Sequence, residues 1–135
     1  MTKMIFVNLP VTDLAASEKF YVALGCEKNP QFSDENATSM VWSDQITFML
    51  LKRDYFATFT PRPIADPKAA VGVFLALSAD SREDVDAVIE RTGAAGGKAD
   101  TREPQDLGFM YQRTVEDPDG HTFEIAHMDM SKVDW

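Results

Sequence analysis

The sequence is poor in residues that would commit it to a specialised fold or partner. Cys26 is its one cysteine, which excludes an internal disulfide and any zinc site built from several thiolates, and indicates a reducing compartment. Beside Gly25 we expect Cys26 to be a half-buried apolar residue, with a reactive thiol as the alternative. Basic residues number 13 against 22 acidic ones, a formal net charge of −9. The negative electrostatic field of such a protein repels phosphates and anionic lipids, so neither nucleic acid nor a membrane is an expected partner.

Long apolar runs and familiar catalytic signatures are also missing. The stretch before Pro10 is too short for the apolar part of a signal peptide, so we expect a cytoplasmic protein. No glycine-rich phosphate loop, Gly-x-Ser-x-Gly elbow or His-Glu-x-x-His helix is present. With 44% hydrophobic and 26% charged residues, the chain has the composition of an ordinary globular protein with a real core.

The first part of the chain follows one repeatable order. Thr12 or Asp13 can cap a helix that ends at Gly25, because Leu14, Ser17, Phe20, Tyr21 and Leu24 recur at helical spacing. Runs rich in β-branched and aromatic residues predict strands at 5–11, 38–42 and 46–51, with a weaker one within 26–32.

The second part repeats this order after a proline-rich linker at about 53–70. Ser81 can cap a helix whose buried stripe is Val85, Val88 and Ile89, and strands are predicted at 71–77, 98–102, 109–116 and 121–128. The sequence therefore predicts two β-α-β-β-β modules, at about 1–52 and 71–130, within a single domain spanning 1–135. Each module leaves one apolar sheet face to be covered by another module or another chain.

Several motifs in fixed order point to a family. They are Leu9-Pro10-Val11-Thr12-Asp13-Leu14, then Phe20-Tyr21 and Leu24-Gly25, and finally Glu116-Asp117-Pro118-Asp119-Gly120-His121 leading to Phe123-Glu124. In this spacing the chain resembles the vicinal oxygen chelate superfamily, which includes glyoxalase I, bleomycin resistance proteins and extradiol dioxygenases. The resemblance implies an α+β, glyoxalase-like fold, in which the two modules form a cupped, mostly antiparallel sheet of eight strands.

The resemblance also implies a divalent metal held by four side chains, from the first and last strands of each module. The closing position falls on Glu124, but the others fall on Phe6 or Asn8, on Met49, and on Val73 or Gly72. Phenylalanine, methionine and valine are not ligands for such a cation. We therefore expect no metal cofactor, and a divalent metal in an atypical shell around Glu124 is the alternative.

Glu124 is the candidate catalytic residue, because a carboxylate in an apolar cup must find a partner or raise its pKa, which suits a general base. The competing interpretation is an ion pair or hydrogen bond with Arg113 or Tyr111. His121 and His127 alternate onto the other face of the same strand and cannot easily complete a metal shell. The expected ligand-binding residues are Asn8, Met49, Tyr111, Arg113 and Glu124, although the Asn8 amide could equally pair with backbone.

The favoured interpretation is a small-molecule binding protein similar to glyoxalase-like and bleomycin-resistance-like proteins, with a cationic or neutral ligand because the chain is acidic. The alternative is an enzyme of the same superfamily, either a lyase or isomerase similar to lactoylglutathione lyase or a dioxygenase. We also expect a homodimer, with the aromatic linker and the tail 128–135 as contact surface. The sequence identifies neither the ligand nor a reaction.

Overall fold

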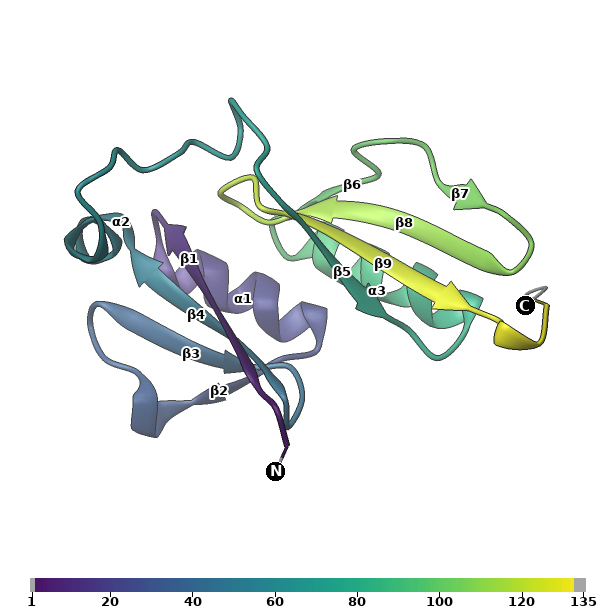
Figure 1. The fold of residues 1–135 in the computed structure, drawn as a ribbon, viewed down its shortest axis with the longest axis horizontal. Helices are drawn as coiled ribbons and strands as arrows, with labels where there is room; N and C mark the ends of the chain where they lie inside the picture. The colour runs from purple at the N-terminus through teal and green to yellow at the C-terminus, as the bar shows by residue number, and fades with distance from the viewer. Residues whose placement is uncertain (1, 133–135) are drawn as a thin grey trace. The chain divides into compact units, whose positions relative to one another are not determined.

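The structure, a computed structural model, describes residues 2–132. The chain folds into two compact units, Met1–Asp66 and Pro67–Trp135. Each unit contains one sheet with a helix across one of its faces (Figure 1). None of the helices within residues 2–132 is long and apolar enough to cross a membrane. Residues 133–135 of the tail that we expected at a dimer contact lie outside the described part.

The first unit has a four-stranded sheet with the order β1-β4-β3-β2. Its edge strand β1 runs parallel to β4, and the remaining pairs are antiparallel. The elements are β1 (Ile5–Val11), α1 (Leu14–Leu24), β2 (Glu27–Asn29), the 3₁₀ turn η1 (Pro30–Phe32), β3 (Ala37–Val41), β4 (Ile46–Lys52), and the helical turns α2 (Arg53–Phe56) and η2 (Ala57–Phe59).

Helix α1 begins and ends where the sequence predicts. The Asp13 carboxylate accepts a hydrogen bond from the Ala16 backbone N–H at 3.2 Å, which satisfies one of the free donors of the first turn. Gly25 ends the helix with φ 117°, a left-handed conformation that favours glycine. The buried side chains of the helix are the predicted Ser17, Phe20, Tyr21 and Leu24.

The two faces of the first sheet have different roles. Thr38 donates a hydrogen bond to Glu18 of α1 at 2.9 Å, so its side of the sheet faces the helix. Phe48 and Leu50 of β4 lie on that side and are at most 1% exposed. Because successive residues of a strand alternate between faces, Met49 points away from the helix. The face that α1 leaves uncovered is where a ligand can approach.

The second unit repeats the same order, with the sheet β5-β9-β8-β6 and a short additional strand β7 on β8. Helix α3 is capped by Ser81, whose hydroxyl accepts from the Asp84 N–H at 3.0 Å. It packs Val85, Val88 and Ile89 against the sheet as predicted. The elements are β5 (Phe74–Ser78), α3 (Arg82–Ala94), β6 (Lys98–Ala99), β7 (Gln105–Asp106), β8 (Met110–Glu116), β9 (Thr122–Met128) and the 3₁₀ turn η3 (Met130–Lys132).

The predicted α+β fold of two similar modules is confirmed, with differences at strand ends. Strand β5 begins at Phe74, three residues later than predicted, where its pairing with Thr122 of β9 begins. Strand β6 stops at Ala99, because Asp100 adopts φ 54° and turns the chain out of the sheet. No sequence pattern predicts β7, which raises the strand count above the eight expected.

Cys26 is more deeply buried than we expected, with 6% of its surface exposed. Burial raises the pKa of its thiol to about 12, so the reactive thiolate is scarce in the folded protein. We predict that iodoacetamide, at mildly alkaline pH, alkylates Cys26 at least ~100-fold more slowly in the folded protein than in urea. Mass spectrometry of quenched samples measures both rates, and equal rates would mean that Cys26 is accessible in the native state.

Candidate functional site

The uncovered face of the first sheet carries a pocket of about 520 Å³, called the apolar pocket below. Strands β1, β3 and β4 form its floor, and residues from the flanking segments form its walls. The residues that line it are Met4, Phe6, Asn29, Phe32, Ser39, Val41, Ser43, Asp44, Thr47 and Met49.

Sheet register places the floor residues in adjoining rows. Phe6 pairs with Thr47, which pairs with Val41 on its other side. In the next row Asn8 pairs with Met49, which in turn pairs with Ser39. Paired residues in neighbouring strands share a face, so both rows point away from α1.

The walls and floor are largely apolar. Met4, Phe6 and Phe32 are 55%, 56% and 64% exposed, although large apolar side chains normally lose most of their surface on folding. The hydroxyl-bearing residues Ser39 and Thr47 are 4% and 5% exposed and interrupt this apolar floor. A hollow with apolar walls and a few polar groups is the usual form of a site for a small organic molecule.

Met49 and Asn8, two of the residues proposed from the sequence, are thus brought side by side. Met49 lines the apolar pocket, and Asn8 lies next to it on β1. Asn8 is exposed rather than enclosed, so water can solvate its amide and the free-energy cost of leaving it without a protein partner is small. Within residues 2–132 its side chain makes no hydrogen bond, so the expected backbone partner is not found and the amide can bind a ligand.

Glu124 lies in the second unit, on the face of β9 that α3 leaves uncovered. It pairs across the sheet with Thr114 of β8 and Ala76 of β5. Its neighbours in the strand, Phe123 and Ile125, are buried on the helix side, as the predicted alternation requires. The carboxylate accepts a hydrogen bond from the guanidinium of Arg102 at 2.8 Å, with 17% and 44% of the two side chains exposed.

The partners expected for Glu124 were wrong, because Tyr111 and Arg113 lie on the opposite face of β8. Arg113 pairs in the sheet with Ile125 and reaches Asp86 of α3 at 3.0 Å. The Tyr111 hydroxyl donates to the same Asp86 carboxylate at 2.7 Å, which lowers the pKa of Asp86 and raises that of Tyr111. These contacts join α3 to the sheet, so Tyr111 and Arg113 do not share a site with Glu124.

We predict that Glu124→Gln lowers the free energy of unfolding by no more than about 1 kcal/mol, because partly exposed ion pairs contribute little. Urea unfolding of the wild type, Glu124→Gln, Arg102→Gln and the double variant gives the coupling between the two side chains. A loss of roughly 3 kcal/mol or more from Glu124→Gln would instead indicate a buried ion pair, in which the unpaired charge of Arg102 destabilises the variant.

The positions at which the resemblance implied a divalent metal do not suit one in this chain. Register places Phe74 and Ala76 of β5 on the face of Glu124, whereas the expected Val73 and its alternative Gly72 both precede this strand. Neither Phe74 nor Ala76 has a ligand atom, and Phe6 and Met49 of the first unit offer none that suits a hard or borderline cation. Within residues 2–132 no group of three or more His, Cys, Asp or Glu side chains could hold a metal ion.

Glu124 is the one carboxylate among the four positions at which the resemblance implied metal ligands. We expect elemental analysis after dialysis to find far less than one zinc, nickel, iron or manganese ion per chain, since a single carboxylate does not hold such ions tightly. A ratio near one that survives dialysis, and that Glu124→Gln removes, would show an atypical metal shell at Glu124.

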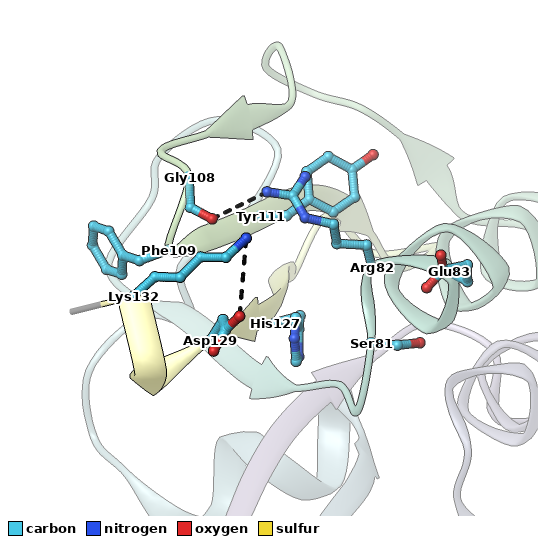
Figure 2. Close-up of a pocket in the computed structure, with 9 residues that line it drawn as sticks. All are labelled: Ser81, Arg82, Glu83, Gly108, Phe109, Tyr111, His127, Asp129 and Lys132. Atoms are coloured by element: carbon cyan, nitrogen blue, oxygen red, sulfur yellow. Dashed lines mark hydrogen bonds and ion pairs between the residues drawn. The ribbon is translucent and has the colours of Figure 1, made fainter.

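A second, polar pocket of about 210 Å³ lies at the end of the second unit (Figure 2). Its cationic groups are already engaged. The Arg82 guanidinium bonds to both carboxylate oxygens of Asp106, at 2.9 and 2.7 Å, and holds the pKa of that carboxyl well below its usual range. Lys132 lies 3.9 Å from Asp129, and His127 makes a hydrogen bond of 3.0 Å with the Ala79 carbonyl. These pairings and the small volume make it a weaker candidate than the apolar pocket.

Most of the residues that line the apolar pocket were not predicted from the sequence as ligand-binding residues. Ser39, Val41 and Thr47 alternate along β3 and β4 with the residues of the helix side, such as Met40 and Phe48, and that alternation would have revealed them once the helix side was known. Met4 precedes the first predicted strand, and Phe32 ends the weaker strand predicted within 26–32, where the chain instead forms the 3₁₀ turn η1, so neither gives such a signal.

Comparison with known proteins places the chain in a family. A family model described as the Glyoxalase/Bleomycin resistance protein/Dioxygenase superfamily matches residues 3–125. The chain belongs to this superfamily. The resemblance seen in the sequence motifs is thereby confirmed. No curated protein is similar enough to count as a match.

Solved structures share the fold over nearly the whole chain. A hypothetical protein from S. aureus is 26% identical, with a TM-score of 0.78 and 94% of each chain covered. A glyoxalase-related enzyme from Fulvimarina pelagi is 22% identical, with a TM-score of 0.79 over 94% of this chain and 88% of the other. TnmS3, an antibiotic binding protein from Streptomyces sp. CB03234, is 20% identical, with a TM-score of 0.65 over 95% and 97%. The last two likenesses concern the fold alone.

Proposed function

We propose that this superfamily member binds a small, largely apolar organic molecule, neutral or cationic, in the apolar pocket. The observation that carries the proposal is the pocket itself, a hollow of about 520 Å³ with exposed phenylalanine and methionine side chains. That volume lies within the range of about 300–1,000 Å³ usual for small-molecule sites. Covering these side chains would remove apolar surface from water and so favour binding.

The surrounding polar groups can orient such a ligand. The hydroxyls of Ser39 and Thr47 lie in the floor, and the free amide of Asn8 lies beside Met49. Each can exchange a hydrogen bond with a carbonyl, ether or hydroxyl of the bound molecule. TnmS3, another protein with this fold, is an antibiotic binding protein. This likeness supports ligand binding without catalysis as the function of the present chain.

The alternative function, a lyase, isomerase or dioxygenase acting through Glu124, has less support. A general base needs a carboxylate oxygen within reach of the proton that it removes. In this chain an arginine already holds the Glu124 carboxylate at 2.8 Å. The other positions at which the resemblance implied metal ligands carry apolar side chains or an amide, and none of these groups is a ligand for a hard divalent cation or an acid-base group.

Methionine methyl groups provide a direct test of where a ligand binds. We would label the methionine methyl carbons and record their resonances by NMR while titrating phenylbutanol, a neutral probe with an apolar body. Met4 and Met49 line the apolar pocket, Met40 is fully buried in the core, and Met110 belongs to the second unit.

The proposal predicts saturable shifts at Met4 and Met49 with little change at Met40 and Met110. Met49→Leu removes one resonance and assigns it. Shifts confined to Met110, Met128 or Met130, or none at a probe concentration near its solubility limit, would contradict binding in the apolar pocket.

A further inference from the structure

We propose that Asp44 makes the apolar pocket selective for ligands that carry a cationic group on an apolar body. This inference rests on the proposed function and adds the chemical class of the ligand. Among the residues within 2–132 that line the pocket, Asp44 is the one whose side chain carries a charge at neutral pH, and no lysine or arginine of this range accompanies it. A ligand ammonium group would find a counter-ion there, whereas a ligand carboxylate would meet repulsion.

Asp44 has no role in holding its own turn together. It lies in the turn Ser43-Asp44-Gln45 between β3 and β4, which backbone bonds between Ser43 and Ile46 close at 3.1 and 3.3 Å. The Gln45 N–H donates to the Ser43 hydroxyl at 3.2 Å. Within residues 2–132 the Asp44 carboxylate makes no hydrogen bond or ion pair, so it remains available to a ligand.

Two other aspartates of this unit, unlike Asp44, hold their local backbone structure through side-chain hydrogen bonds. Asp13 caps α1, and Asp34 accepts bonds from the Asn36 and Ala37 N–H groups at 2.7 and 3.0 Å. Those carboxylates serve the fold, and replacing them would disturb it. Asp44 can be changed with little structural cost, because asparagine is also favoured in turns.

The aromatic walls favour the same class of ligand. Phe6 and Phe32 line the pocket and are more than half exposed, so their ring faces are accessible. A cation near such a ring is attracted by the negative charge of the ring face. The net charge of −9 adds a long-range attraction for cations, which salt weakens.

Three probes with one apolar body separate charge from shape: phenylbutylamine, phenylbutanol and phenylbutanoate. At neutral pH they carry a positive charge, no charge and a negative charge. Isothermal titration calorimetry gives their affinities, and the Met4 and Met49 methyl resonances locate them. We expect the amine to bind about two- to fivefold more tightly than the alcohol, as an exposed ion pair allows, and the carboxylate to bind most weakly.

Asp44→Asn should remove the preference for the amine, because it lowers the affinity for the amine by about two- to fivefold and changes the affinity for the alcohol less than this. Glu35→Gln is the matched control, because Glu35 is exposed, lies in the same unit and does not line the pocket. This control should keep the preference, whereas added salt should reduce it in the wild type.

The two proposals fail in different ways. An unchanged preference in Asp44→Asn, or carboxylate binding as tight as amine binding, would overturn the selectivity alone. Failure of all three probes to shift Met4 and Met49 would overturn the proposed function and the selectivity with it.

Discussion

Replacing Met49 by lysine should weaken phenylbutylamine binding on the order of a hundredfold, because the change places a charge in the apolar pocket. Met49 rises from β4, which lies between β1 and β3 in the sheet. A lysine there projects its ammonium group over the pocket floor, where it occupies space, keeps water bound and repels a cationic ligand. Calorimetric titration of the wild type and Met49→Lys measures the loss.

Met49→Leu is the matched control, since leucine keeps the apolar character and nearly the volume of methionine. It should bind the amine within about tenfold of the wild type, since a volume-conserving change usually costs less than about 1.5 kcal/mol. Both variants should remain folded, because Met49 is half-buried on the face away from the core. Binding that survives Met49→Lys would place the ligand elsewhere in the molecule.

Local signals in the sequence were sufficient to predict helices α1 and α3 and most of the strands. Asp13 and Gly25 bound α1, and Ser81 begins α3, because caps depend on residues close in the chain. Proline and glycine in Asp117-Pro118-Asp119-Gly120 likewise suit a turn, which forms with the Gly120 N–H donating to the Asp117 carbonyl at 3.0 Å. Strand β7 was missed because two residues are too short for a periodic signal.

The candidate site was predicted only in part, because it depends on register and on loops. The alternation of β9 predicted the face on which Glu124 lies. Its neighbour on β8 depends on the register between the two strands, which pairs Glu124 with Thr114 and not with Arg113. Its partner Arg102 lies in a loop that starts where Asp100 leaves the sheet, and no periodic pattern predicts that path. Likewise Asp44 reaches the apolar pocket from a turn, so its place there depends on the pairing of β3 with β4.

Replacing Phe48 by alanine should lower the free energy of unfolding of the first unit by about 3–5 kcal/mol. Phe48 is 1% exposed, its ring centroid lies 5.7 Å from that of Tyr21, and it pairs with the fully buried Met40. The truncated side chain would leave a cavity between β4 and α1 that close-packed neighbours fill only in part. The loss is comparable to the whole stability of many small domains.

Urea unfolding followed by tryptophan fluorescence measures this change in the correct unit. Trp42 directly follows β3, and a Trp135→Phe background makes it the sole tryptophan reporter of the first unit. Two units can unfold in separate transitions, so a local reporter is needed for a defined free energy. Circular dichroism of the same samples would record the second unit as well.

Met49→Ala is the matched control for Phe48→Ala, because the two residues are neighbours in β4 and point to opposite faces. The half-buried Met49 should cost about 1 kcal/mol on truncation, well below the value for Phe48, since the open pocket leaves fewer contacts to lose. Its effect should fall instead on binding, because Met49 lines the pocket. Equal losses of stability at the two positions would mean that Met49 is packed as tightly as the core, and the uncovered face of β4 would then not be open to a ligand.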